Sequence, residues 1–144
     1  MLKSYKYFIK HADYVTLIIA IVATLGSLYY SDIKGYTPCI LCWYQRICMY
    51  ALVPVILTGI VRRDDKVYHF TFPLACIGFL IAFYHNLLYT KIIFDDGKCS
   101  TGVSCTTKYI EYFGFITIPF LSLLAFSLIL IFAVLKRRYT RLKK

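Results

Sequence analysis

The chain has 144 residues, of which 60% are hydrophobic and 18% aromatic, and it carries a formal net charge of +10. Its mean hydropathy of +0.66 lies outside the usual range for soluble domains, so the composition indicates a single integral membrane domain. A positive charge is also typical of nucleic-acid-binding proteins. Here the basic residues are spread over predicted helix ends, where membrane topology and anionic lipid account for them, so we expect a lipid bilayer and no nucleic acid as partner.

Four apolar stretches approach or exceed the roughly 18 to 20 residues that a helix needs to cross about 30 Å of hydrocarbon. In chain order they are about Asp13–Tyr30, Ile40–Val61, Val67–Tyr89 and Phe113–Leu135. Lipid offers the backbone no hydrogen bonds, so spanning segments of this kind are helical. The sequence therefore predicts an all-α membrane protein, a four-transmembrane-helix bundle, with kinks at Pro54, Pro73 and Pro119.

The first apolar stretch follows a basic segment, MLKSYKYFIKH, which resembles the start of a signal peptide. The apolar run is too long for a signal peptide, and no small-residue cleavage site is evident. We therefore expect an uncleaved membrane anchor.

The distribution of Lys and Arg predicts which helix ends face the cytoplasm. Twelve of the seventeen basic residues lie on one predicted side: Lys3, Lys6, Lys10, Arg62, Arg63, Lys66, Lys136, Arg137, Arg138, Arg141, Lys143 and Lys144. The other side has four lysines, offset by four acidic residues: Lys34, Lys91, Lys98, Lys108, Asp32, Asp95, Asp96 and Glu111. Both termini are therefore predicted to be cytoplasmic, and the loop of about residues 90–112 to be extracytoplasmic.

This topology places four of the six cysteines at the extracytoplasmic face, where disulfides persist. They are Cys39 and Cys42, at the start of the second helix, and Cys99 and Cys105, in the loop. The other two, Cys48 and Cys76, lie within predicted spans, where cysteine usually acts as a small inert hydrophobe. We expect these two to lie at different depths, roughly 12 and 20 Å below the outer boundary, and not to bridge each other.

The stretch TPCILCWYQR, residues 37 to 46, places a Cys-x-x-Cys pair where the second helix begins. Pro38 suits the first turn of a helix, so Cys39 and Cys42 are predicted to lie in the N-terminal turns. The helix dipole and free N–H groups favour an anion there, which makes a thiolate available near neutral pH. The pattern therefore indicates a redox pair.

Arg46 lies one helical turn beyond Cys42, on the same face and about 6 Å deeper. A guanidinium at that depth is costly unless it extends back to the membrane surface or meets an anion or a polar ligand. Extension to the surface is the simpler interpretation. The functional alternative is that Arg46 stabilises negative charge on a thiolate or on a reduced cofactor beside the dithiol.

The loop segment KCSTGVSC separates Cys99 from Cys105 by five residues, including Gly102, which permits a tight, exposed ring. A disulfide there would be accessible for exchange. A purely structural disulfide is an alternative, and a zinc site made by all four cysteines is another. Zinc pairs usually have two to four residues between them, and zinc would quench both thiolates, so we expect no metal.

PCILCWYQR opens the second span, a loop cysteine pair follows, and FGFITIPF enters the fourth span. This ordered combination resembles the DsbB family of bacterial disulfide-bond formation proteins, from about Val15 to Leu135. The compact loop and the WYQR sequence are particularly similar to the BdbC-type members of Gram-positive bacteria. Gram-negative relatives differ in having a longer second loop with a wider cysteine spacing.

The resemblance implies a quinone-linked protein thiol-disulfide oxidoreductase in the bacterial cytoplasmic membrane, with menaquinone or ubiquinone as cofactor. Its partner would be an extracytoplasmic thioredoxin-fold dithiol oxidase of the DsbA or BdbD type, whose reduced thiol would attack the Cys99–Cys105 disulfide at Cys99. Cys105 would then exchange with Cys39. Cys42 matches the family's inner cysteine, which faces the quinone and forms the thiolate or adduct that reduces it.

Two further residues gain a role from the resemblance. Arg46 matches the family's arginine at the quinone ring, and His85, in FYHNLL, resembles a position near the quinone. His85 titrates near neutral pH as a residue type and could assist proton uptake, although a lone interfacial histidine is more often a hydrogen-bonded anchor.

Three rival classes differ from this interpretation. Enzymes of the vitamin K epoxide reductase type also combine four helices with two cysteine pairs, but in them the loop pair comes first along the chain and the Cys-x-x-Cys pair lies at the last helix. A transporter or channel would be expected to show buried carboxylates or broken helices, and Arg46 is the one charge that we place deep within a span. A non-catalytic membrane scaffold with structural disulfides is the third.

Overall fold

The computed structural model describes residues 11–92, 105 and 117–142. These residues form four long helices and one short π-helical segment: α2 (Ala12–Leu28), η1 (Tyr29–Ile33), α3 (Ile40–Val61), α4 (Tyr68–Tyr89) and α5 (Ile118–Leu142). The described part of the chain contains no strand. All four long segments, with η1 continuing α2, are long and apolar enough to cross a membrane, which confirms the predicted fold class.

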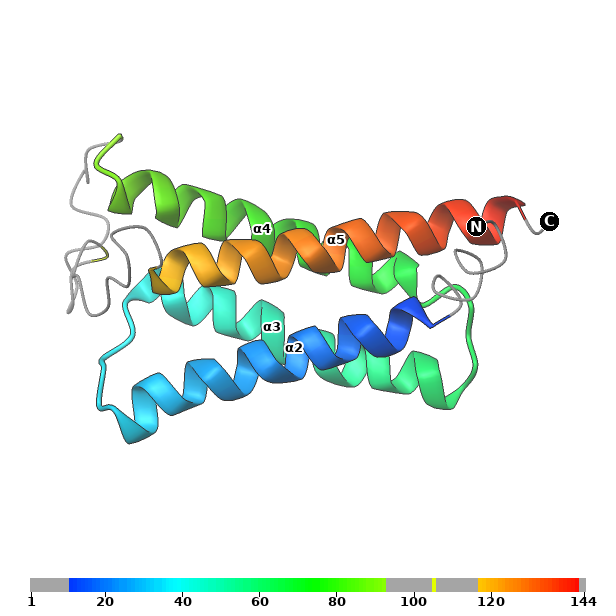
Figure 1. Cartoon of the computed structure of the whole chain (residues 1–144), viewed down its shortest axis with the longest axis horizontal. Helices are drawn as coiled ribbons and strands as arrows, with labels where there is room; N and C mark the ends of the chain where they lie inside the picture. The colour runs from blue at the N-terminus through cyan, green and yellow to red at the C-terminus, as the bar shows by residue number, and fades with distance from the viewer. Residues whose placement is uncertain (1–10, 93–104, 106–116, 143–144) are drawn as a thin grey trace.

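The four helices lie side by side along the long axis of the molecule (Figure 1). Helix α2 packs against α3 and α5, and α4 packs against the same two helices, so each helix has two neighbours. The start of α2, the α3–α4 connection and the end of α5 share one end of the bundle, while the start of α3 and the end of α4 share the other (Figure 1). This arrangement agrees with termini on one side of the membrane; that this side is cytoplasmic stays a prediction.

The helix bounds differ most from the prediction at the last helix. Helix α3 has the predicted bounds, and α4 begins one residue later than predicted, at Tyr68. Helix α5 continues to Leu142 instead of ending near Leu135, because the basic residues that follow the apolar run are good helix formers. The predicted start of this helix at Phe113 lies outside the described residues.

Two of the three prolines that we expected to kink helices lie in helix interiors: Pro54 in α3 and Pro73 in α4. Pro119 is instead the second residue of α5, where proline costs no helical hydrogen bond, so no kink is expected there. Thr117 precedes this helix, and its Oγ1 accepts a hydrogen bond from the Phe120 N–H at 3.4 Å.

The core depends on small residues that let the helices approach closely. Phe126 of α5 and Leu52 of α3 are fully buried, together with Ala75 and Ala82 of α4. The Phe126 ring occupies the space in which a Cβ on Gly78 would lie, so that glycine permits α4 and α5 to meet. Small residues at helix contacts are the usual solution in membranes, where no hydrophobic effect drives helices together.

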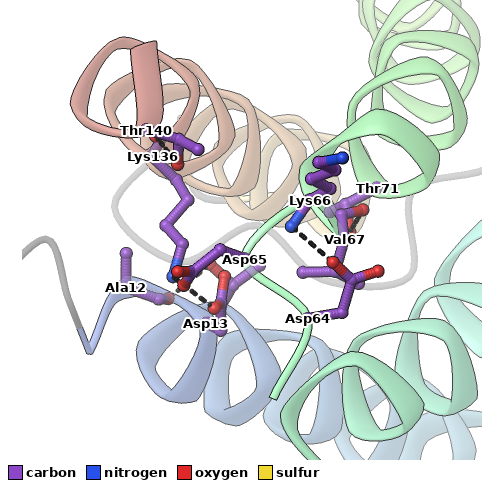
Figure 2. Close-up of polar contacts among 10 residues, drawn as sticks. Ala12, Asp13, Asp64, Asp65, Lys66, Val67, Thr71, Lys136 and Thr140 are labelled. Carbon is purple, nitrogen blue, oxygen red and sulfur yellow. Dashed lines mark hydrogen bonds and ion pairs between the residues drawn. The ribbon is translucent and has the colours of Figure 1, made fainter. Parts of the chain in front are cut away.

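A buried ion pair joins three segments at the end of the bundle that holds the start of α2 (Figure 2). Lys136 of α5 has a side chain only 4% exposed, and its Nζ lies 2.8 Å from Oδ2 of Asp13 in α2. Asp65, in the α3–α4 connection, lies 3.4 Å away on the other side and is 61% exposed. Lys136 therefore lies at the end of the bundle where the sequence placed it, but it is buried in an ion pair, which the charge count did not predict.

The two cysteines that we placed inside spans have no redox partner. Cys48 is buried in the core, and Cys76 is half-buried. Both are free thiols, as predicted.

Candidate functional site

The Cys-x-x-Cys pair lies where α3 begins. Cys39 is the N-cap residue, with extended backbone angles of φ −70° and ψ 170°, and its Sγ accepts a hydrogen bond from the Cys42 N–H at 3.4 Å. Pro38 lies just before the cap instead of in the first turn, and it disfavours helical angles at Thr37. The two sulfur atoms lie 2.9 Å apart, within hydrogen-bond distance, and both cysteines are free thiols.

The surroundings favour Cys39 as the thiolate of this pair. The hydrogen bond from Cys42 lowers the pKa of the Cys39 thiol from its usual 9.0 to about 4, with a hydrogen bond from His85 adding to the shift, while burial opposes it. A cysteine sulfur at a helix N-cap receives backbone N–H groups in the same way as an N-cap oxygen, which adds a further small stabilisation of the anion. The helix start therefore favours a thiolate, as the sequence indicates.

His85 connects this pair to the loop cysteine. Its side chain is 2% exposed, near the end of α4. The Nε2 atom lies 3.1 Å from the backbone oxygen of Cys105 and 3.7 Å from Sγ of Cys39. Its Nδ1 atom lies 3.0 Å from the side-chain nitrogen of Gln45 in α3. One imidazole thus contacts α3 on one side and the loop on the other.

Cys105 is disulfide-bonded and only 3% exposed, packed with Cys39 and Leu88. Its predicted partner, Cys99, lies outside the described residues. We predicted an exposed ring, which is wrong for Cys105, because the ends of α3 and α4 cover it. The two predicted cysteine pairs therefore meet at Cys39 and Cys105.

The Arg46 side chain is buried inside the bundle. It is 9% exposed, and it donates from Nε to Oγ of Ser27 and from Nη2 to the backbone oxygen of Ser27, both at 2.7 Å. Its guanidinium also lies 5.4 Å from the centre of the Trp43 ring, a cation–π distance. An arginine has five N–H donors, so two bonds to Ser27 leave three for other groups.

Ser27 lies two residues before η1, the π-helical segment Tyr29–Ile33. Single π-helical turns inside longer helices often occur at functional sites. This one follows the residue to which Arg46 is bonded, so it lies beside the buried charge.

Two hollows adjoin the cysteines. A small cavity of about 70 Å³ is bordered by Cys39, Cys42 and Cys105 and by Arg46 and His85. A larger groove of about 450 Å³ runs between α2 and α5 over α3, from residues with exposed outer edges such as Val22 and Leu124 to Cys42 and Arg46. We define this second hollow as the α2–α5 groove.

The α2–α5 groove also contains a polar atom that the sequence did not single out. Oγ1 of Thr24 is buried without a hydrogen-bond partner among the described residues, and Thr24 lines the groove. Threonine in a helix usually bonds to a carbonyl one turn earlier. This hydroxyl is therefore available to a ligand that reaches it.

Sequence reasoning missed Gln45 and Ser27 as partners of His85 and Arg46. Gln45 is 7% exposed in the middle of an apolar span, and a lone amide in such a span is a usable signal because its hydrogen-bonding groups need partners there. Nothing in the sequence distinguishes Ser27 from other small residues at helix contacts.

Cys39, Cys42 and His85 place three possible metal-ligand atoms within 4.8 Å of one another. The zinc alternative raised by the sequence requires all four cysteines as thiolates. Cys105 is in a disulfide, and a disulfide sulfur is not a thiolate ligand, so that four-cysteine set is not formed here.

The sequence profile of the family described as Disulfide bond formation protein DsbB matches residues 10–136. The chain belongs to the DsbB family. Among the relatives of this DsbB-family chain is Disulfide bond formation protein C of Bacillus subtilis (strain 168), 46% identical over 123 residues that cover 85% of this chain and 89% of the relative. No solved structure matches the chain significantly.

Two further relatives have similar names. Probable disulfide formation protein C 1 of Bacillus anthracis is 42% identical over 120 residues, covering 81% of this chain and 86% of the relative. Probable disulfide formation protein of Oceanobacillus iheyensis is 40% identical over 134 residues, which cover 88% of this chain and 90% of the relative. The DsbB-family chain is therefore a multi-pass bacterial membrane protein and a thiol-disulfide oxidoreductase of disulfide-bond formation.

Proposed function

We propose that this protein oxidises an extracytoplasmic thioredoxin-fold dithiol protein of the DsbA or BdbD type and delivers the electrons to a membrane quinone. One observation carries the proposal: Cys39 lies beside Cys42 on one side and, through His85, beside disulfide-bonded Cys105 on the other. Electrons can therefore pass along sulfur atoms from the loop to the α2–α5 groove.

The first half of the reaction exchanges disulfides. A thiolate of the partner attacks the loop disulfide at Cys99, one S–S bond forms to the partner, and Cys105 leaves as a thiolate. Cys105 then attacks Cys39 in an oxidised Cys39–Cys42 pair, which forms a Cys39–Cys105 bond and releases Cys42 as a thiolate. Each step makes one S–S bond and breaks one, so no external oxidant enters until the inner pair is reoxidised.

The electrostatics of the inner pair favour electron flow toward it. A thiolate held at a pKa of about 4 stabilises the reduced form of the Cys39–Cys42 pair, and a stabilised reduced form makes the corresponding disulfide a stronger oxidant. The oxidised inner pair can therefore take electrons from the reduced loop cysteines.

The residues around the α2–α5 groove fit a quinone. Its volume of about 450 Å³ is within the range of small-molecule sites, roughly 300–1,000 Å³, and its walls are mostly apolar. Arg46 offers N–H donors and Thr24 a hydroxyl for ring oxygens, and the outer edge of the groove suits an isoprenoid chain. A bound quinone would accept two electrons and two protons, and menaquinone and ubiquinone both carry ring oxygens that can accept from these donors.

Arg46 has a defined task in this arrangement. Ser27 holds the guanidinium in place, beside the groove that Cys42 also lines. A fixed positive charge there stabilises negative charge that develops on the Cys42 sulfur or on a ligand oxygen, without reorganising during the reaction. His85 contacts the sulfur pair, and a contact with the quinone stays part of the proposal.

The cysteines are proposed to face the extracytoplasmic side. The basic residues Arg62, Arg63 and Arg141 lie at the opposite end of the bundle, where the positive-inside rule places the cytoplasm. A thiol reagent that cannot cross membranes should label the reduced Cys39–Cys42 pair on intact cells. If the pair is labelled only after the membrane is opened, the proposed orientation is wrong.

Purified protein in lipid nanodiscs should reduce a menaquinone analogue when it is given a reduced thioredoxin-fold dithiol oxidase. Cys42→Ser should abolish quinol formation, and Arg46→Ala should lower its rate by about 100-fold, the size typical of losing one fixed stabilising donor. Cys76→Ser is the matched control, because this half-buried free thiol lies outside both hollows. Quinol formation that survives in both site variants would reject the proposal.

A further inference from the structure

Gln45 is a polar residue inside an apolar helix, and it contacts Nδ1 of His85. Its side chain is 7% exposed within an apolar helix, and its amide nitrogen lies 3.0 Å from Nδ1 of His85. A buried amide that lacks partners destabilises a membrane helix, so a retained glutamine is expected to have a specific partner. Here that partner is the imidazole that bridges the two cysteine pairs.

The contacts of His85 select one tautomer. Nε2 lies 3.1 Å from the backbone oxygen of Cys105, and a carbonyl oxygen can only accept a hydrogen bond. Nε2 must therefore carry a proton. In a neutral imidazole Nδ1 is then an acceptor, which requires a donor opposite it, and the NH₂ group of Gln45 is that donor. The opposite tautomer would place two acceptors against each other at Cys105.

The selected tautomer also bears on sulfur chemistry. The Nε2–H that binds the Cys105 oxygen lies 3.7 Å from Sγ of Cys39. It holds the loop backbone against the start of α3 and presents a donor to the Cys39 sulfur. A donor at this point stabilises negative charge on Cys39 and keeps Cys105 within reach for exchange.

We propose that Gln45 is a positioning residue for disulfide exchange: by donating to Nδ1 it fixes His85 as the Nε2–H tautomer, which holds Cys105 beside Cys39. The proposal rests on the proposed function for its role in electron transfer, but the tautomer itself does not. In the exchange step, the Cys105 thiolate attacks Cys39, a Cys39–Cys105 bond forms, and the Cys39–Cys42 bond breaks with the charge on Cys42. No proton or external oxidant is needed for that step.

The tautomer can be read directly by ¹⁵N NMR of protein labelled at histidine, with His85→Gln used to assign the signal among the three histidines. Wild type should show a proton on Nε2 and none on Nδ1. Gln45→Glu presents only acceptor oxygens, so Nδ1 should gain a proton. Gln45→Met leaves only the Cys105 carbonyl to select the tautomer, so part of the population should shift to the form protonated on Nδ1. Ser127→Ala is the matched control, because this serine bonds only within its own helix among the described residues.

Exchange can be followed without quinone. Protein oxidised at both pairs is given one equivalent of dithiothreitol, quenched with acid and alkylated, and the appearance of the Cys39–Cys105 bridge is measured by mass spectrometry. Gln45→Met should slow bridge formation by about fivefold, the effect of one lost hydrogen bond, while Ser127→Ala should not change it. Thermal unfolding of each variant separates this effect from misfolding.

The outcomes separate the two proposals. A proton on Nδ1 in wild type, or a Gln45→Met variant with the wild-type tautomer and exchange rate, would overturn the positioning role whether or not quinone is reduced. If the tautomer and exchange results hold and wild type fails to reduce any quinone, the positioning role stands and the quinone proposal falls.

Discussion

Replacing Lys136 by methionine tests the buried ion pair at the end of the bundle away from the cysteines. Methionine matches the length and volume of the lysine stem but removes its charge. Asp13 then remains as a carboxylate that is mostly shielded from water, with an exposed side-chain fraction of 20%. Asp65 is 61% exposed and hydrated by itself, so most of the cost arises at Asp13.

The magnitude follows from the contacts. Removing one partner of a fully buried pair costs roughly 3–5 kcal/mol, because the remaining charge is uncompensated. Asp13 retains partial exposure and lies in the first turn of α2, where the helix dipole favours an anion. We therefore expect Lys136→Met to lower the free energy of unfolding by about 2–3 kcal/mol. Adding Asp13→Asn should restore at least half of that loss, since it removes the stranded charge.

The measurement is reversible unfolding in mixed micelles titrated with dodecyl sulfate, followed by helical circular dichroism. Lys66→Met is the matched control: Lys66 is an exposed lysine in the nearby connection, and its contact to Asp64 is made by the backbone N–H. It should change stability by less than about 0.5 kcal/mol. Equal stability of Lys136→Met and Lys66→Met would refute the reasoning, as would a double variant less stable than Lys136→Met alone.

Reduced wild-type protein should keep the Cys39 thiolate absorbance near 240 nm from neutral pH down to about pH 5 and lose it through about pH 4. In Cys42→Ala the pKa of the Cys39 thiol should move toward the usual 9.0. An absorbance that titrates near pH 9 in wild type would contradict the assigned hydrogen bond. Because the pKa of Cys39 is depressed in the folded state, its thiolate stabilises the reduced protein fully above pH 9, and this stabilisation is lost as the pH falls through 4. The free energies of unfolding of reduced wild type and Cys42→Ala should therefore converge at acid pH. Gly78→Ala should lower stability by about 1–3 kcal/mol, because the new Cβ meets the Phe126 ring, while Gly26→Ala, whose Cβ meets nothing within 4 Å, should not; equal unfolding curves would show that the ring moves aside freely.

Hydropathy alone predicted the four spans, because crossing a bilayer constrains the apolar content of every turn. It placed the last helix end seven residues too early, at Leu135 instead of Leu142, since an apolar run ends at the hydrocarbon boundary and a helix does not. The ion pair of Lys136 with Asp13 was not predicted either. Counting charges predicts at which end of a helix a residue lies, but not which face of the helix carries it.

The sequence named the cysteines, Arg46 and His85 of the candidate site but not the contacts that join them. Cys39 and Cys42 are identified by spacing within one helix start, which the local sequence records. The contacts of His85 with Gln45 and Cys105 join residues 40 and 20 positions apart, and they depend on how two helices are rotated against each other. No local pattern encodes that rotation. The burial of Cys105 was missed for the same reason.

The two bonds that tether Arg46 respond differently to mutation. The bond to the hydroxyl of Ser27 disappears with any replacement other than threonine, but the bond to the carbonyl goes to a group that every residue type possesses. Position 27 can therefore drift in evolution without releasing the guanidinium, provided that the helix keeps its path. An arginine secured in this way depends on the shape of its neighbour more than on its neighbour's identity.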